Sequence, residues 1–331
     1  MFSALLLLGC DSSSTLSDIG EVNAISVPET REGKTGNAMA PGWSTPQRVR
    51  DINVGAAPEV EVFNGKLHIV YRGQSSNRIG HLTMNASHVF STPVVLSDET
   101  SGQPALTINS SGDRMYLAFR GTSGIQAPTY PDGHADYYYR IGLKSIGLTG
   151  SWSSTTVLNA NGYDLRTAHS PEIVPNGSGG VYVYFYDGVE NWAVANVAQN
   201  GNVTSVDDAG FQATEVSVYD YIGRRGIDFP RVGGSKELYI GQVGNWEQIT
   251  GVTAKNGPTV AVSYANGVPR THLAYRGDNV GVGYISPDRS FTGSIGTQTG
   301  ATPAIAIFNN RVYIFFKNDN NNELFYTYKN L

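Results

Sequence analysis

From about residue 43 to the C-terminus, apolar and polar positions alternate over short segments that turn residues separate. Residues 59–63 read Glu-Val-Glu-Val-Phe, a polar Asn-Gly turn follows, and 67–71 form the aromatic-rich run Leu-His-Ile-Val-Tyr. Alternation with a period of two is typical of β-strands. No segment has the periodicity of a helix, so the pattern predicts an all-β chain.

This unit recurs along the chain. Each copy opens with a proline, continues with a short alternating strand and a polar turn, and reaches a strand rich in Tyr and Phe. The opening prolines are Pro58, Pro104, Pro171, Pro230, Pro258 and Pro303, and the aromatic strands cover 67–73, 115–121, 181–188, 238–241, 271–277 and 312–317. Most units add a third strand, such as 79–83, and a fourth that begins with an aromatic residue, such as 90–96 or 152–158.

Four antiparallel strands in about 45 residues make one blade of a β-propeller. We therefore predict an all-β β-propeller with six four-stranded blades. Five or seven blades stay open as alternatives, because the unit at Pro230 is the least regular. The sixth unit ends at Leu331 after its third strand, and the missing fourth-strand pattern stands at 43–49 instead. We expect this N-terminal strand to pair with the last blade, close the ring and cover its edge.

The first 42 residues differ from the repeats. The string Leu7-Leu8-Gly9-Cys10 ends an apolar run and resembles the bacterial lipobox, in which the cysteine is lipidated. We expect a signal peptide at 1–10 with lipidation at Cys10, a flexible tether at 11–42 and the propeller at 43–331. The protein would then be anchored in the cell envelope, on the periplasmic side of the inner membrane or in the outer membrane. No Lys or Arg precedes the run, so an incidental cysteine in a frayed N-terminus remains the alternative.

Composition narrows the possible partners. Hydrophobic residues make up 40% of the chain and charged residues 15%, which fits a folded core rather than a disordered chain. The net charge is −5 and no basic block occurs, so we expect no nucleic-acid partner. A single cysteine allows neither an intrachain disulfide nor a cysteine-based zinc site. We expect no metal and no cofactor.

Three stretches exceed the minimum that the repeat needs, and long loops in compact domains are usually functional. They run from 122 to about 138, from 159 to 170 and from about 210 to 229. Strand alternation would place all three on one face, over blades two to four, as a composite ligand site or as a simple cap on the channel. Aromatic rings and polar groups there suit a sugar. The expected ligand-binding residues are Tyr130, His134, Asp136, Tyr137, Asp164, His169, Asp187, Trp192, Tyr221, Arg224, Arg225 and Asp228.

Three arginines recur at equivalent positions, each between an aromatic residue and a glycine. They are Arg72, Arg120 and Arg276, with Lys317 in the sixth unit. A set of arginines can gather an anionic ligand. Because the residue repeats with the fold, we favour a role in bracing each blade.

The repeat Pro-x4-Phe-Asn-Gly-x-Leu-His-Ile-Val-Tyr-Arg-Gly at 58–73 resembles blades of bacterial lectin-like propellers, broadly the sialidase-like and fucose-binding lectin type. The resemblance lies in framework residues and implies a propeller that often binds glycans. We therefore expect lectin-like recognition of a glycan or another polar ligand.

Two alternatives stay open. The blade openings at 169–174 and 227–232 resemble those of five-bladed arabinanase-like enzymes, which implies a glycoside hydrolase with carboxylates at blade starts. Its catalytic set would come from Glu172, Asp228, Asp164 and Asp187. A propeller that binds a protein partner, as an inhibitor or a scaffold, is the third class, because one fold serves many functions.

Overall fold

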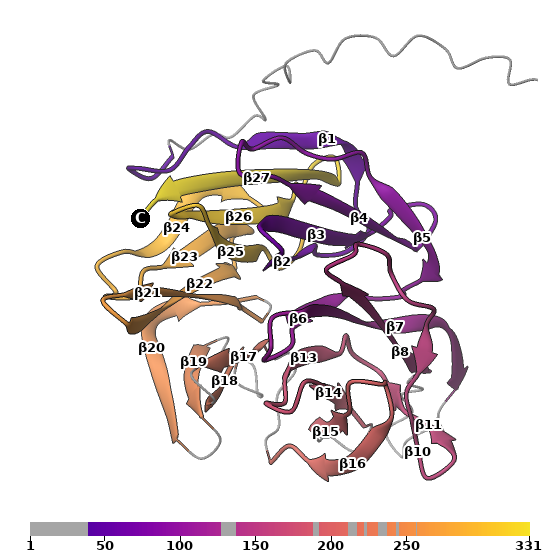
Figure 1. The fold of residues 1–331 in the computed structure, drawn as a ribbon. Helices are drawn as coiled ribbons and strands as arrows, with labels where there is room; N and C mark the ends of the chain where they lie inside the picture. Colours follow the sequence, from indigo (N-terminus) through magenta and orange to yellow (C-terminus); the bar gives the residue numbers. More distant parts are fainter. Residues whose placement is uncertain are drawn as a thin grey trace, which may run out of the picture.

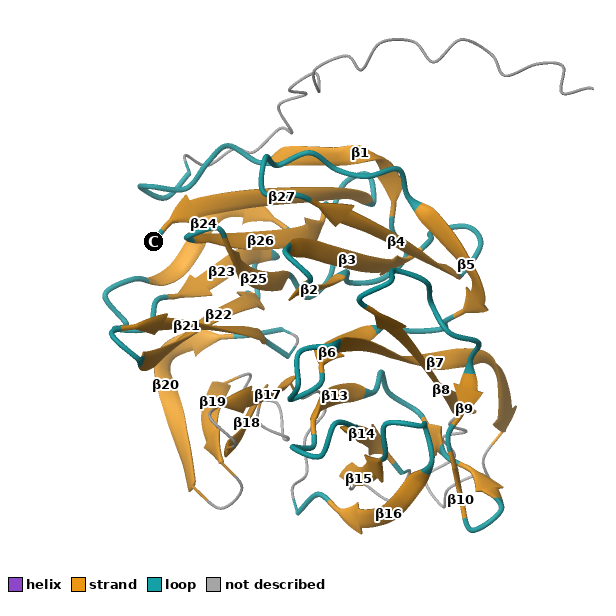
Figure 2. Ribbon diagram, viewed as in Figure 1, coloured by secondary structure: helices purple, strands orange, loops and turns teal. Residues whose placement is uncertain are grey.

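The computed structural model describes residues 39–126, 137–187, 192–210, 217–221, 224–230, 237–242, 245–255 and 257–331. Within these ranges the regular elements are strands, and their sheets stand around a common centre (Figures 1 and 2). Five sheets have four strands and one has five. Their innermost strands touch in a closed circuit, β2–β6–β13–β17–β21–β25 and back to β2. The predicted β-propeller is confirmed.

The blades follow the chain. Blade one holds β2 (Glu59–Phe63), β3 (Lys66–Arg72), β4 (Arg78–Met84) and β5 (Val94–Glu99). Blade two holds β6 (Ala105–Ile108), β7 (Arg114–Gln126), β8 (Tyr137–Gly147) and, beside β8, the short β9 (Thr156–Val157) and β12 (Arg166–Thr167). Between these two lies the hairpin β10 (Asn159–Ala160) and β11 (Tyr163–Asp164). Blade three holds β13 (Glu172–Pro175), β14 (Val181–Tyr186), β15 (Trp192–Val197) and β16 (Val203–Asp208).

Blade four holds β17 (Ser217–Tyr221), β18 (Arg224–Pro230), β19 (Glu237–Gln242) and β20 (Asn245–Thr253). Blade five holds β21 (Thr259–Ala265), β22 (Val268–Arg276), β23 (Gly281–Ile285) and β24 (Thr292–Gln298). Blade six holds β25 (Ala304–Phe308), β26 (Arg311–Lys317), β27 (Glu323–Asn330) and, as its outer strand, β1 (Gln47–Asn53).

The N-terminal strand closes the ring, as the sequence predicts. In Figure 1, β1 lies along β27, and Gln47 is opposite Tyr326 in an antiparallel pair. The amide of Ser44 donates to the carbonyl oxygen of Tyr328 at 2.8 Å, and the Arg48 guanidinium pairs with the Glu323 carboxylate at 2.6 Å. Blade six thus gains its fourth strand from the other end of the chain, and its edge is covered.

The expected start of blade four is wrong. Pro230 ends β18, the second strand of the blade, and the innermost strand is β17, which no proline precedes. Proline is tolerated at the end of a strand, where it removes little of the hydrogen-bonded ladder. Within the stretch from 210 to 229, the described residues 217–221 and 224–229 belong to two paired strands.

Inside three blades an aromatic ring of the second strand covers a glycine of the third. Tyr71 lies opposite Gly80, Phe119 opposite Gly142 and Tyr275 opposite Gly283. A Cβ atom built on these glycines would stand 2.1, 2.4 and 2.2 Å from the Cζ atom of the ring. Only glycine leaves room for the ring, so these positions are fixed by packing rather than by backbone angles.

A buried chain of hydrogen bonds joins blade one to blade two. Trp152 Nε1 donates to His81 Nδ1 at 3.2 Å, and His81 Nε2 lies 3.0 Å from His68 Nδ1. An indole nitrogen can only donate, so His81 is neutral and carries its proton on Nε2, which it donates to His68. Blade five repeats the arrangement with Tyr284 in the place of His81: its hydroxyl lies 2.7 Å from His272 Nδ1, and the ring of Trp43 packs on it edge to face.

Cys10 and most of the expected tether lie outside the described residues. In the described part of the chain, no helix is long and apolar enough to cross a membrane.

The glycine under Tyr275 gives a first prediction. Gly283→Ala should lower the free energy of unfolding by about 2 kcal/mol, because the added methyl group displaces a buried ring. Gly147→Ala is the matched control, since its nearest neighbour would lie 4.0 Å away, and it should stay within about 0.5 kcal/mol of wild type. Urea unfolding of both variants measures this, and equal losses would contradict the packing argument.

The junction of blades one and two gives a second prediction. Burial lowers the pKa of His68 and of His81 from 6.5 to about 4. Between these values the unfolded chain binds protons that the folded chain does not. The contribution of the two neutral histidines to the free energy of unfolding is therefore fully present above pH 6.5. It decreases toward pH 4, by about 1.4 kcal/mol per histidine per pH unit.

The variant His81→Tyr copies Tyr284 and removes one group of the histidine pair, while His68 and His272, whose pKa burial also lowers to about 4, remain. Thermal unfolding from pH 7.5 to 4.5 should show a shallower fall of the melting temperature in this variant than in wild type. An identical fall in both proteins would show that the histidine pair is not responsible.

Candidate functional site

A cavity of about 330 Å³ opens where the chain enters the innermost strands. We call it the mouth. Blades two and three supply its polar and aromatic side, namely Gln103, Arg120, His169, Ser170, Glu172 and Trp192. The entries of blades one, five and six supply small residues, which include Ala56, Ala57, Gly257, Gly300, Ala301 and Thr302. Successive blades bring these loops to one end of the channel because each innermost strand starts there.

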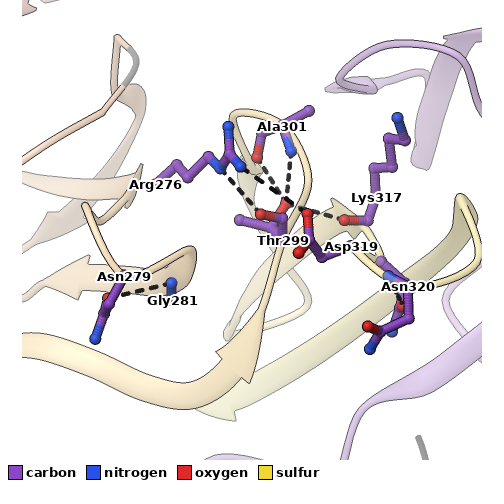
Figure 3. A network of polar contacts seen from close by, with 9 residues as sticks. Arg276, Asn279, Gly281, Thr299, Ala301, Lys317, Asp319 and Asn320 are labelled. Carbon is purple, nitrogen blue, oxygen red and sulfur yellow. Dashed lines mark hydrogen bonds and ion pairs between the residues drawn. The ribbon is translucent and has the colours of Figure 1, made fainter.

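The recurring arginines hold the loops that form the mouth. Arg72 Nη1 donates to the carbonyl oxygen of Ser101, which precedes blade two, at 2.9 Å. Arg120 donates to Ser101 Oγ at 2.8 Å and also to the carbonyl oxygen of Ala168, which precedes blade three. In Figure 3, Arg276 of blade five reaches Thr299 before blade six, at 3.0 Å from its carbonyl oxygen. The bracing role is confirmed, since each arginine ties its blade to the next entry loop.

A buried threonine ties each of three entry loops to its own blade. Thr100, Thr167 and Thr299 are fully buried. Each hydroxyl accepts a hydrogen bond from the amide two residues later, at 3.2 to 3.3 Å. Each also bonds the end of the second strand, as Thr299 does to the carbonyl oxygen of Lys317 at 3.0 Å. Sequence reasoning missed these residues, although each stands four positions before an opening proline.

An aromatic corner marks the blade-three side of the mouth. The ring of His169 meets that of Tyr186 edge to face at 4.6 Å and lies nearly parallel to that of Trp192 at 6.5 Å. Trp192 is almost fully buried and backs the partly exposed His169. Glu172, the first residue of β13, lines the same cavity. The structure thus brings together three residues that the sequence had singled out.

A polar chain crosses the entries of blades one to three. Glu59 Oε2 accepts a hydrogen bond from Gln103 Nε2 at 3.1 Å, and Ser170 Oγ accepts one from the Gln103 amide at 2.9 Å. Burial, with a smaller contribution from the nearby Glu61, raises the pKa of Glu59 to about 8, so Glu59 is mostly protonated at neutral pH. Gly102 makes this approach possible, because a Cβ there would stand 2.5 Å from Ser170 Oγ. Neither Glu59 nor Gln103 had been expected in the site.

Several expected ligand-binding residues lie elsewhere. Asp164 belongs to the β10–β11 hairpin on the outer side of blade two, where Arg140 Nε pairs with it at 2.7 Å. Tyr221 and Arg224 face each other at the hairpin end of β17 and β18, and Arg225 is next to them, so the backbone register places all three at the end of blade four opposite the mouth. The proposed site over blades two to four therefore does not include these four residues.

The remaining candidates lie nearer the mouth or outside the described residues. Asp228 is opposite Ser217 where β17 begins, and Asp187 follows β14 directly. Tyr137 pairs with Gln126 in an extension of the β7–β8 hairpin. Tyr130, His134 and Asp136 lie outside the described residues. Among the residues that are described, no group of three His, Cys, Asp or Glu side chains could hold a metal ion.

Comparison with known proteins shows the fold. No family model matches the chain, and no curated protein matches it by sequence. Among solved structures, the Trypanosoma rangeli sialidase aligns with a TM-score of 0.58 at 11% identity over 86% of this chain, which spans 55% of the sialidase. A Penicillium chrysogenum alpha-L-arabinanase complexed with arabinobiose aligns at 0.57, with 13% identity over 86% of this chain and 94% of the enzyme.

The SapL1 lectin, solved in complex with alpha methyl fucoside, aligns at 0.50, with 10% identity over 81% of this chain and 90% of the lectin. The resemblance to sialidase-like and lectin propellers is thereby confirmed for the fold. At these identities the likeness extends to the β-propeller architecture, and the neighbours comprise both glycan-binding and glycan-processing proteins.

Proposed function

We propose that the protein binds a saccharide at the mouth, in the manner of a lectin. The observation that carries the proposal is the aromatic corner beside polar groups on one side of a cavity of about 330 Å³. Aromatic rings offer apolar faces to sugar C–H groups, while carboxylate, amide and hydroxyl groups pair with sugar hydroxyls. The cavity lies at the small end of the usual range for ligand sites, which suits one or two sugar units.

Hydrolysis is the second candidate, and Glu172 favours it, because it is a carboxylate at the start of a blade and lines the cavity. A glycosidase needs two carboxyl groups that flank the scissile bond. Among the described residues that line the mouth, Glu172 is the one carboxylate, and Asp164 is held by Arg140 on the outside of blade two. Binding needs no second carboxyl group at the mouth, and we therefore propose it first.

The binding proposal predicts selective losses. The protein is titrated calorimetrically with α-methyl fucoside, arabinobiose and sialyllactose, and the same protein is mixed with chromogenic glycosides. His169→Ala and Glu172→Gln should each weaken the bound probe about tenfold, because each removes a contact at the mouth worth about 1.4 kcal/mol. Tyr264→Ala is the control, since Tyr264 is 61% exposed near the β21–β22 turn, away from the mouth, and should bind as wild type does.

Turnover that Glu172→Gln abolishes would move the assignment to a glycosidase. No binding and no turnover with any probe would contradict a saccharide ligand and favour a protein partner.

We also propose that the propeller is displayed from a membrane through a lipid on Cys10, in the cell envelope. The lipobox-like string at 7–10 supports this. Cells that express the full chain should incorporate labelled palmitate into it, and Cys10→Ser should abolish the label. Equal labelling of both proteins would contradict the anchor.

A further inference from the structure

Gln103 is held at the mouth from two sides. Its backbone amide donates to Ser170 Oγ at 2.9 Å, and its side-chain Nε2 donates to Glu59 Oε2 at 3.1 Å. Gln103 and Ser170 line the cavity, and Glu59 is the first residue of β2, the innermost strand of blade one. A carboxyl group of one blade thus grips an amide that the next blade presents to the cavity.

We infer that Glu59, once ionised, is a positioning residue that decides which end of the Gln103 side-chain amide faces the ligand; this inference rests on the proposed saccharide site. A primary amide carries its donor Nε2 and its acceptor Oε1 on different sides. With Nε2 turned to Glu59, Oε1 is turned away from it. Gln103 therefore offers an acceptor oxygen, which binds a hydroxyl group through its hydrogen.

The protonation state of Glu59 changes how firmly this orientation is held. An ionised carboxylate only accepts hydrogen bonds, so it binds Nε2 alone. A protonated carboxyl can accept and donate, so it tolerates either end of the amide. Ionisation of Glu59 should therefore fix Gln103 in the orientation that exposes Oε1.

Glu59 is the titratable group to which the Gln103 side chain donates a hydrogen bond. The flanking innermost strands, β6 and β25, carry no titratable side chain over 105–108 and 304–308. The other titratable groups near it are Glu61 on β2, Lys66, His68, Tyr71 and Arg72 on β3, and Arg120, His169 and Glu172 at the mouth. Burial raises the pKa of Glu59 to about 8 and that of Glu61 to about 7, so the change falls in an accessible range.

A ligand-free measurement tests the positioning directly. In the full chain with 15N-labelled glutamine, the side-chain amide signals of Gln103, assigned by their loss in Gln103→Ala, should shift with a midpoint near pH 8. In Glu59→Gln they should not shift around that pH. Signals that stay unchanged between about pH 6 and pH 10 in wild type would overturn the inference, whatever any ligand does.

Ligand affinity provides the second test, with whichever of α-methyl fucoside, arabinobiose and sialyllactose binds. Above pH 8, where Glu59 is ionised, Glu59→Leu leaves Gln103 Nε2 without its acceptor and should weaken binding about fivefold. Glu59→Gln accepts from either orientation of the amide and should bind within about twofold of wild type. Glu247→Gln is the control, because Glu247 is exposed, pairs with Arg289 at 2.7 Å and lies on the outer strand of blade four.

Equal affinities of Glu59→Leu and wild type would overturn the positioning role. If wild type binds none of the probes, the proposed function fails, and the titration of the Gln103 signals still decides whether Glu59 orients the amide.

Discussion

The structure depends on half-buried guanidinium groups that donate hydrogen bonds to oxygen atoms of the loops between blades. Among the described residues, Arg72 and Arg120 have no carboxylate partner, and the oxygen atoms of Gly55, Ser101 and Ala168 take their place. A buried charge that loses such partners is costly, so these carbonyl groups must stay where the arginines require them. They belong to the loops that enter the blades. The same contacts that join the blades therefore fix the loops that form the mouth.

The junctions between blades use one geometry with different chemistry. A third-strand residue packs against an aromatic residue that begins the fourth strand of the next blade: His81 against Trp152, Tyr284 against Trp43 and Tyr326 against Phe90. The shape of the contact is retained, while the acid–base properties are not. Only the first of these three places an imidazole against the indole, so that junction buries two histidines of lowered pKa, His68 and His81, whereas the junction of blades five and six buries one, His272.

Sequence periodicity was sufficient for the strands, the repeat and the closure by β1, because each of these depends on local alternation or on counting units. It misplaced blade four because Pro230 stands at a strand end, where proline is also tolerated, and because β17 has no opening proline. His169 and Glu172 could be found because they flank the blade opening at Pro171, and Trp192 because it follows the second strand of that blade. Glu59 and Gln103 could not, because their contact joins residues 44 positions apart in different blades.

The two sides of the mouth differ, although the framework around it repeats. Blades two and three contribute the amide, guanidinium, imidazole, carboxylate and indole groups, whereas the described entries of blades one, five and six contribute mainly Ala, Gly and Thr. A propeller that bound one ligand per blade would repeat the polar set at each entry. The described residues instead provide one set, placed to one side of the channel, which fits the proposed binding of one saccharide at the mouth. If the proposed saccharide site and the proposed lipid anchor both hold, strong attachment would come from many copies on one membrane, because linked weak sites gain affinity through their effective concentration.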